Sequence, residues 1–210
     1  MDAATLIANI RSQALVGNTG ASDDIDRILR YLNNGYNMVY AEIAQLIPTL
    51  YRRSQNIPIT EGVGLYIFPV FKLLSVRDRN NSFSELVEGS IDDIELSDAG
   101  LNAVGNPTTY DKIFNGLVTY PRNTTVLQLW YVPPPVPLTP DTREIDIQIP
   151  PAFHEVLQWA ALYTMAYDER DKLVGAELQF TKNSYDTLME SLKLHLFSQI
   201  PREQRRVKAW

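Results

Sequence analysis

The stretch from Leu127 to Ala161 reads LQLWYVPPPVPLTPDTREIDIQIPPAFHEVLQWAA, and it decides where sheet gives way to helix. It begins with a predicted strand over residues 127–132, because the side chains there alternate between two faces. One face holds Leu127, Leu129 and Tyr131, and the other holds Gln128, Trp130 and Val132. Prolines follow at positions 133, 134, 135 and 137. Since proline has no N–H group, regular strand pairing must end there or lie on a sheet edge.

A second half-buried strand is predicted over residues 144–149, where Ile145, Ile147 and Ile149 alternate with Glu144, Asp146 and Gln148. The pair Pro150-Pro151 then suits the first turn of a helix, where a missing N–H group costs nothing. Apolar side chains continue at helical spacing: Phe153, Val156, Leu157, Ala160, Ala161, Thr164 and Tyr167. The sequence therefore predicts that a β region ends in this stretch and that a helix begins at the conformationally rigid pair Pro150-Pro151.

Helical periodicity also marks the two ends of the chain. Leu6, Ile7, Ile10 and Ala14 predict a short amphipathic helix. A longer helix is predicted from Asp24 to about Leu50, ended or bent near Pro48. The last helix carries its apolar face on Leu178, Tyr185, Leu188, Leu192 and Leu196, and Pro201 stops it.

Between these helices the period becomes strand-like, and Asn115-Gly116 predicts a hairpin turn. The predicted fold class is α+β, an antiparallel helical bundle with an inserted antiparallel β domain. We assign residues 1–56 and 150–200 to the bundle and residues 57–149 to the β domain. Residues 201–210 form an extended basic C-terminal arm.

Composition narrows the classes of function. The 210 residues include no cysteine, which excludes disulfides, thiolate metal ligands and a cysteine nucleophile. The first 15 residues lack the pattern of a signal peptide, and no apolar run is long enough to span a bilayer. The last ten residues carry four basic side chains and one acidic one, a charge of +3. Since the net charge is −6, the rest of the chain carries −9, which disfavours a general nucleic-acid binder.

Chemical motifs are sparse. The two histidines, His154 and His195, fall in different predicted helices, and no zinc-binding spacing is present. We interpret His154 as a surface or packing residue. No phosphate-binding glycine motif or nucleophile elbow occurs. We therefore expect no catalytic residue, no cofactor and no metal.

The acidic segment around Asp92 is the one alternative source of chemistry. Paired carboxylates can bind a divalent cation or cleave a glycosidic bond, so a cell-wall (peptidoglycan) hydrolase stays open as an alternative. The candidate cation ligands are Asp92, Asp93, Glu95 and Asp98, but they lack the glycine and ligand spacing of a calcium loop. We favour a solvated acidic loop instead. A generic soluble interaction module is the third interpretation.

The order of these elements resembles the head-to-tail adaptor (connector, or head-completion) proteins of tailed bacteriophages. The resemblance covers roughly residues 22–210. It rests on the Ile25–Leu50 stripe, the closing strand LQLWYVPPPVPLT, the helix start IPPAFHEVLQWAALYTMAYDE and the last helix with its extended tail.

The resemblance implies a structural virion protein at the neck, assembled in the host cytoplasm. It implies a homo-oligomeric ring, typically of twelve subunits, that binds the portal protein above. A tail tube, nozzle or second adaptor ring would bind below. DNA would pass through the lumen during ejection without specific binding, and no membrane is involved. An acidic channel wall fits this role, because Lys and Arg contacts to phosphate dominate DNA affinity.

The same resemblance identifies two sets of site residues. The predicted portal-binding residues of the C-terminal arm are Arg202, Arg205, Arg206, Lys208 and Trp210. The predicted tail-facing loop contains Glu85, Glu88, Asp92, Asp93 and Glu95. Both sets are expected to be binding surfaces rather than catalytic centres.

Overall fold

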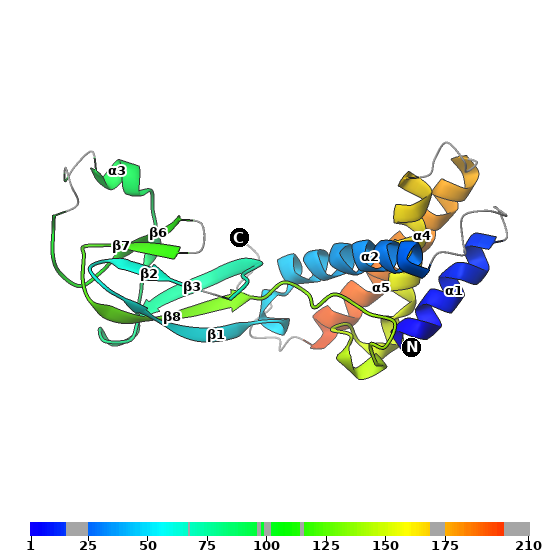
Figure 1. The fold of residues 1–210 in the computed structure, drawn as a ribbon, viewed down its shortest axis with the longest axis horizontal. Coiled ribbons are helices and arrows are strands. Elements are labelled where there is room, and N and C mark those ends of the chain that lie inside the picture. Colours follow the sequence, from blue (N-terminus) through cyan, green and yellow to red (C-terminus); the bar gives the residue numbers. More distant parts are fainter. Residues whose placement is uncertain are drawn as a thin grey trace. The chain divides into compact units, whose positions relative to one another are not determined.

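The structure is a computed structural model of an α+β protein, and it describes residues 1–15, 25–66, 68–95, 98, 102–113, 116–168 and 175–199 (Figure 1). The chain divides into two compact units. The helical unit comprises Met1–Leu46 and Pro135–Trp210, and the β unit comprises Ile47–Pro134. The β unit is thus inserted between the two parts of the helical unit.

The helical unit contains α1 (Ala3–Leu15), α2 (Ile25–Leu46), α4 (Glu155–Asp168) and α5 (Gly175–Gln199). The helices predicted from periodicity are confirmed, and α2 ends just before the 3₁₀ turn η1 (Pro48–Leu50), as its proline requires. The central helix is α4, which packs against α2, α5 and α1. Its buried residues lie on nearly every side: Val156, Leu157, Gln158, Ala160, Ala161, Leu162 and Ala166.

Helices α2 and α4 approach each other most closely at Gly35. A Cβ atom on Gly35 would lie 2.7 Å from the backbone nitrogen of Ala161 and 2.9 Å from the Cβ of Ala160. Small residues on both helices therefore let the two backbones come together. Nearer the C-terminal end of α2, Glu42 accepts a hydrogen bond of 3.0 Å from the Tyr185 hydroxyl and pairs with Lys193, which fastens α5 to α2.

The segment between the last strand and α4 (residues 133–154, the crossover) corrects one prediction. The predicted second strand over residues 144–149 is wrong, because η2 (Glu144–Asp146) is a 3₁₀ turn and no strand pairs with this segment among the described residues. Ile147 and Ile149 are buried, whereas Ile145 is 82 % exposed. Side-chain alternation therefore arises here from an irregular segment lying along the helices.

Side chains from the helices hold the crossover in place. The Asn33 side chain accepts a hydrogen bond from Leu138 N (2.7 Å) and donates one to Leu138 O (3.0 Å). The two ring nitrogens of buried His154 lie 2.8 Å from the carbonyl oxygens of Met1 and Ile149. His154 therefore has a packing role, in agreement with its sequence interpretation. After η3 (Pro151–Phe153), α4 begins at Glu155.

The β unit is built from two four-stranded sheets. Sheet A has the order β1–β8–β3–β4, with β1 (Arg53–Ile59), β8 (Thr125–Val132), β3 (Lys72–Asp78) and β4 (Ser84–Glu85). Sheet B has the order β2–β7–β6–β5, with β2 (Val63–Leu65), β7 (Gly116–Tyr120), β6 (Thr109–Ile113) and β5 (Val87–Glu88). Between β5 and β6 lies the one-turn helix α3 (Ile91–Glu95).

One apolar core joins the two sheets. It contains Ile57, Ile59, Val76, Leu86, Tyr110, Leu117, Leu127 and Leu129. The strand predicted over residues 127–132 is confirmed, and its Leu127 face is the buried one. The sheets are mostly antiparallel, although β5 and β6 pair in parallel.

The hairpin predicted around Asn115-Gly116 is present as β6 and β7, but Gly116 lies in the strand rather than in the turn. Gly116 pairs with Ile113 on one side and with Leu65 on the other. A Cβ on Gly116 would lie 3.0 Å from the Leu65 side chain. The glycine therefore makes room for a neighbouring side chain, and residues 114 and 115 fall outside the described residues.

Candidate functional site

The acidic segment divides between two strands and a short helix. Glu85 lies on β4 and Glu88 on β5, so these two are strand residues rather than loop residues. Glu85 pairs with Arg77 of β3 at 3.7 Å. Both partners are largely exposed, so this pair contributes at most about 1 kcal/mol.

Glu88 is the best-connected carboxylate of the segment. It accepts a hydrogen bond of 2.8 Å from Lys112 Nζ and one of 3.2 Å from the Tyr110 hydroxyl. Burial, followed by the charge of Glu88, raises the pKa of Tyr110 to about 12. The tyrosine therefore keeps its proton at neutral pH, and the three side chains tie β5 to β6.

The remaining acidic residues, Asp92, Asp93 and Glu95, are exposed on α3. The backbone N–H of Asp93 lies 3.5 Å from Ser90 Oγ, which caps this helix turn. Glycoside hydrolysis needs two carboxyl groups placed on either side of a bound sugar, whereas these three lie together on one exposed turn. Among the described residues, no cluster of three or more His, Asp or Glu side chains could hold a metal ion.

Asp98, which the sequence offered as a fourth candidate cation ligand, has a structural role, and so has Asp78, which sequence analysis did not single out. Asp98 accepts hydrogen bonds from Ala103 N (2.9 Å) and the Tyr120 hydroxyl (3.0 Å), and the backbone bond is the main reason that its pKa is lowered. Asp78 is buried, and one of its carboxylate oxygens accepts a hydrogen bond of 2.6 Å from the Thr125 hydroxyl. No pattern in the sequence identifies Tyr120 as a partner of Asp98 or Thr125 as a partner of Asp78, because these side chains are distant in the sequence.

The outer face of sheet B carries several apolar side chains that other described residues leave largely exposed. Paired strand residues point to the same side of a sheet, and register places Leu65, Gly116 and Ile113 in one row and Val63, Val118 and Asp111 in the next. The exposed fractions are 71 % for Leu65, 51 % for Val63 and 45 % for Ile113. Val87 of β5, 69 % exposed, extends the same face through its pairing with Thr109.

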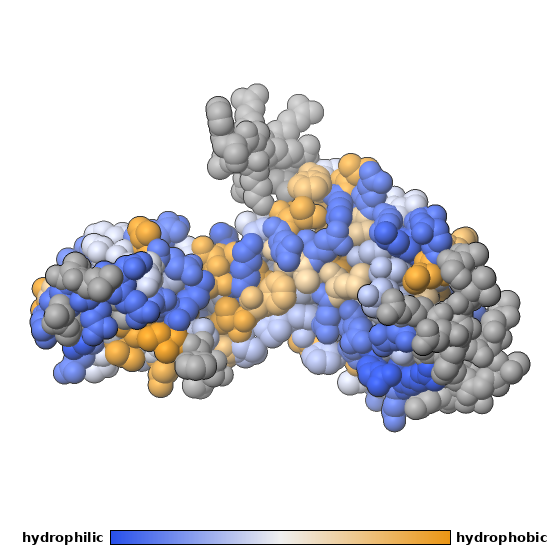
Figure 2. All heavy atoms as spheres, turned by 90° about the horizontal axis from the view of Figure 1, so that it is seen from above, coloured by the Kyte–Doolittle hydropathy of each residue, from blue (hydrophilic) through white to orange (hydrophobic). Residues whose placement is uncertain are grey.

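The opposite face of sheet B is the core side, where Leu117, Thr119 and Tyr110 are buried. Both faces of sheet B thus carry apolar side chains among polar ones, and several of those on the outer face are largely exposed. Figure 2 shows apolar side chains at the surface of the β unit among hydrophilic ones. An exposed apolar surface of this kind marks an interaction site more often than an isolated exposed leucine does.

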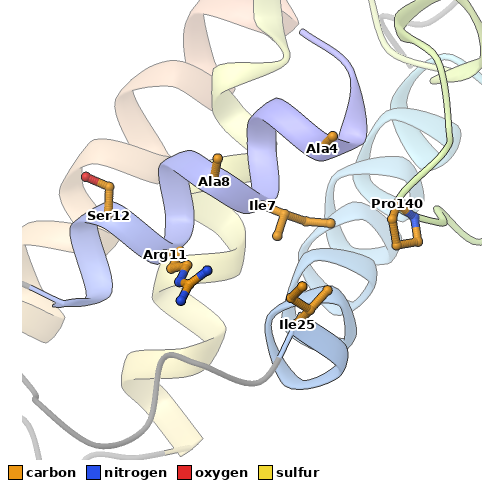
Figure 3. Close-up of a pocket in the computed structure, with 7 residues that line it drawn as sticks. All are labelled: Ala4, Ile7, Ala8, Arg11, Ser12, Ile25 and Pro140. Carbon is orange, nitrogen blue, oxygen red and sulfur yellow. The ribbon is translucent and has the colours of Figure 1, made fainter.

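The helical unit carries a groove of about 490 Å³ beside α1 (Figure 3). It is lined by Ala4, Ile7, Ala8, Arg11 and Ser12 of α1, by Ile25 at the start of α2, and by Pro140 of the crossover. The lining is mostly apolar, with one guanidinium group among small side chains. Sequence periodicity predicted α1 but could not show that its Ala4 and Ala8 side stays open.

The predicted portal-binding residues Arg202, Arg205, Arg206, Lys208 and Trp210 all lie outside the described residues. Within the described part of the chain, no helix is long and apolar enough to cross a membrane.

Comparison with known proteins defines the class. Residues 1–207 match the family model described as SU10 adaptor protein. The chain therefore belongs to the SU10 adaptor protein family, and it is a bacteriophage adaptor, a structural protein of the virion neck. The resemblance inferred from the order of its elements is confirmed. No curated protein matches the chain.

Proposed function

We propose that this adaptor forms a ring of twelve copies between the portal and the tail, with a central channel for DNA. The C-terminal arm, residues 201–210, binds the portal through its basic side chains and Trp210. The β unit binds the tail side, where the partner is a tail tube, a nozzle or a second adaptor ring. The family match over nearly the whole chain supports the adaptor role.

The negative charge of the chain supports a channel through which DNA passes without being bound by the wall. The chain without its last ten residues carries −9. A wall with this excess of carboxylates repels phosphates, and it offers few of the Lys and Arg contacts that dominate DNA affinity. DNA therefore moves through the lumen without a specific binding site.

The observation that carries the tail-side assignment is the uncovered apolar face of sheet B. A small β unit gains nothing in stability by exposing Leu65 and Val87, at 71 % and 69 %, to water. A partner that covers this face would bury both side chains, each contributing about 1.5–3 kcal/mol on full burial. The acidic residues of α3, which follows β5 in the chain, would favour a partner with basic residues at the border of the contact.

The test replaces Leu65 and Val87 together by serine and follows virion assembly. Because both side chains are mostly exposed, the β unit should fold normally, and the ring should still form on the portal. Tails should fail to attach, so filled heads with adaptor but without tails should accumulate. The matched control is Ile145→Ser, which removes an 82 % exposed isoleucine from the helical unit and should leave tail attachment intact. Normal tail attachment in the double variant would refute the assignment.

A further inference from the structure

Strand β1 forms one edge of sheet A, and its first part is exposed. Sheet A has the order β1–β8–β3–β4, so only the β8 side of β1 is paired within the sheet (Figure 1). The four consecutive residues Arg53, Ser54, Gln55 and Asn56 are all exposed. Since successive side chains of a strand point to opposite faces, the other described residues leave both faces of β1 open here.

Hydrogen bonds of β8 show which main-chain groups of β1 are left over. In an antiparallel ladder, successive residues turn their N–H and C=O groups to opposite sides of the strand. The carbonyl oxygens of Val126 and Val132 accept hydrogen bonds from the backbone of Arg79 and Phe71, the two residues that flank β3. The even-numbered residues of β8 therefore face β3, and the odd-numbered residues face β1.

Residues 53, 55, 57 and 59 of β1 pair with the odd-numbered residues of β8, so their main-chain groups face β8. The N–H and C=O groups of Ser54 and Asn56 therefore point away from the sheet. Pro58 has the same orientation but no N–H group, and a Cβ atom on Gly64 of β2 would lie 3.1 Å from its carbonyl oxygen. The open edge thus consists of the four main-chain groups of Ser54 and Asn56.

The spacing of these groups determines what can cover them. An extended main chain is the partner that matches the alternating N–H and C=O groups of a strand edge. Natural edge strands are usually blunted by prolines, bulges or short length. Strand β1 has seven residues, and its pairing with β8 shows no register shift. Its single proline lies beyond the open groups, so the edge is able to accept a further strand.

The described strands of a second copy do not match this edge. The other edge strands of the two sheets are β4 and β5, with two residues each, and β2, with three. Pairing of β1 with β1 of a second copy would be a two-fold contact, which closes on itself and is not repeated around a ring. The occupant is therefore a strand of a different protein.

Arg53 determines the charge that this strand should carry. Among the described residues, Arg53 is exposed and forms no ion pair. The neighbouring Arg52 instead lies over the Trp130 ring, 4.5 Å from its centroid. Opposite charges on adjacent strands stabilise their pairing. An acidic side chain of the incoming strand, next to Arg53, would therefore set its register.

We propose that β1 accepts an extended, acidic segment of the tail-side partner as a fifth strand of sheet A. The proposal rests on the proposed function, in which the β unit binds the tail side. Main-chain hydrogen bonds to Ser54 and Asn56 supply the affinity of this contact, and the carboxylate beside Arg53 supplies its register.

Proline at the open positions tests the pairing. Ser54→Pro/Asn56→Pro removes both outward N–H groups without touching the ladder to β8, and Pro58 shows that β1 accepts proline in this orientation. Filled heads that carry the variant are mixed with a concentration series of purified tails, and attached tails are counted by electron microscopy. Because each lost main-chain hydrogen bond lowers affinity about fivefold, the variant should bind tails about 25-fold more weakly per subunit.

The matched control is Ser54→Ala/Asn56→Ala, which removes the two side chains and keeps both N–H groups. It should attach tails normally, whereas Arg53→Glu should weaken attachment about fivefold. Normal attachment by the double-proline variant or by Arg53→Glu would overturn the proposal. Weak attachment by the alanine control would also overturn it, because side chains would then carry the contact.

Hydrogen exchange of the wild-type chain gives a readout that does not depend on the folding of a variant. In the free chain, the amides of Ser54 and Asn56 should exchange faster than those of Gln55 and Ile57, which lie within the ladder to β8. In complexes of heads with tails, the peptide covering residues 53–57 should lose its fast-exchanging amides. Fast exchange that persists in these complexes would contradict the pairing.

The two proposals fail in different ways. If Leu65→Ser/Val87→Ser and the double-proline variant both attach tails normally, the tail-side assignment of the β unit is wrong. If only Leu65→Ser/Val87→Ser blocks attachment, the β unit binds the tail but β1 does not. If the double-proline variant keeps the melting temperature of the wild type but no longer assembles on the portal, β1 pairs within the ring or with the portal, and the proposal is overturned.

Discussion

Replacing Gly35 by alanine tests the packing at the centre of the helical unit. The new methyl group would lie 2.7 Å from Ala161 N, and 2.9 Å from both the carbonyl carbon and the Cβ of Ala160. Overfilling a packed site costs about 1–3 kcal/mol. Because two of these neighbours are backbone atoms that cannot rotate away, we place the cost at the upper end, about 3 kcal/mol.

Helix propensity works in the opposite direction. Alanine is favoured over glycine inside a helix by about 1 kcal/mol. The expected net destabilisation of Gly35→Ala is therefore about 2 kcal/mol. For a unit of this size, that lowers the melting temperature of the helical transition by about 8 °C, at about 4 °C per kcal/mol.

The assay is thermal unfolding followed by circular dichroism at a helix wavelength, so that the signal reports mainly the helical unit. The control is Asn34→Ala, which changes the adjacent, exposed residue of the same helix and should shift the free energy of unfolding by no more than about 0.5 kcal/mol. If Gly35→Ala were as stable as the wild type or more stable, the close approach of α2 and α4 would be refuted.

Three further predictions concern the candidate site. Replacing Asp98 by asparagine should lower the stability of the β unit at neutral pH. Because the pKa of Asp98 is lowered in the fold, the stabilisation by its carboxylate is present above the ordinary carboxyl pKa and is lost as the pH falls through the lowered value. The stabilities of wild type and variant should therefore converge in acid-unfolding experiments. Replacing the exposed acidic residues of α3 (Asp92, Asp93 and Glu95) by their amides should leave folding and virion assembly largely intact, whereas loss of a measured wall-degrading activity in this variant would favour a hydrolase. Deleting residues 201–210 should abolish portal binding and leave the melting temperature unchanged, because losing a buried tryptophan anchor costs about 2–4 kcal/mol per subunit. Normal portal binding by the truncated chain would refute the proposal that the C-terminal arm binds the portal. A much lower melting temperature would show that these residues belong to the fold.

The sequence predicted the helices well, because each buries one face and shows it as periodicity. The stripe from Ile25 to Leu50 corresponds to α2, which ends at Leu46, and the spacing from Phe153 to Tyr167 corresponds to η3 followed by α4. The strand over residues 127–132 was equally clear, since Leu127 and Leu129 belong to the core. These patterns depend only on residues that are close in the sequence, and the folded chain has the helices and the strand that they predict.

Predictions from the sequence were wrong where one local pattern is compatible with more than one kind of structure. Alternating isoleucines at 145, 147 and 149 fit a strand, but the segment lies along the helices and is held by Asn33 and His154. Gly116 fitted a turn, but it lies in β7 beneath Leu65. In both cases the segment contacts residues that are distant in the sequence, and such partners cannot be predicted from neighbouring residues.

The exposed apolar face of sheet B and the groove beside α1 could not be predicted from the sequence. From the sequence alone, Leu65 and Val87 would be predicted as ordinary core residues. The strand register and their exposed fractions place both on the exposed face of sheet B. In the sequence, nothing distinguishes Ala4 and Ala8 as surface residues of interest. In the structure they line a groove together with Ile25 and Pro140. The acidic segment was recognised from composition, but its division between strand residues and α3 depends on the pairing of β4 with β3 and of β5 with β6.

The central claim is that this adaptor assembles as a ring on the portal, and native mass spectrometry of the chain alone and mixed with its cognate portal tests it most directly. We expect a monomer or small oligomer for the chain alone. With the portal we expect a single complex whose mass corresponds to a closed ring of adaptor copies on the portal. Failure to detect any complex with the portal would contradict the claim.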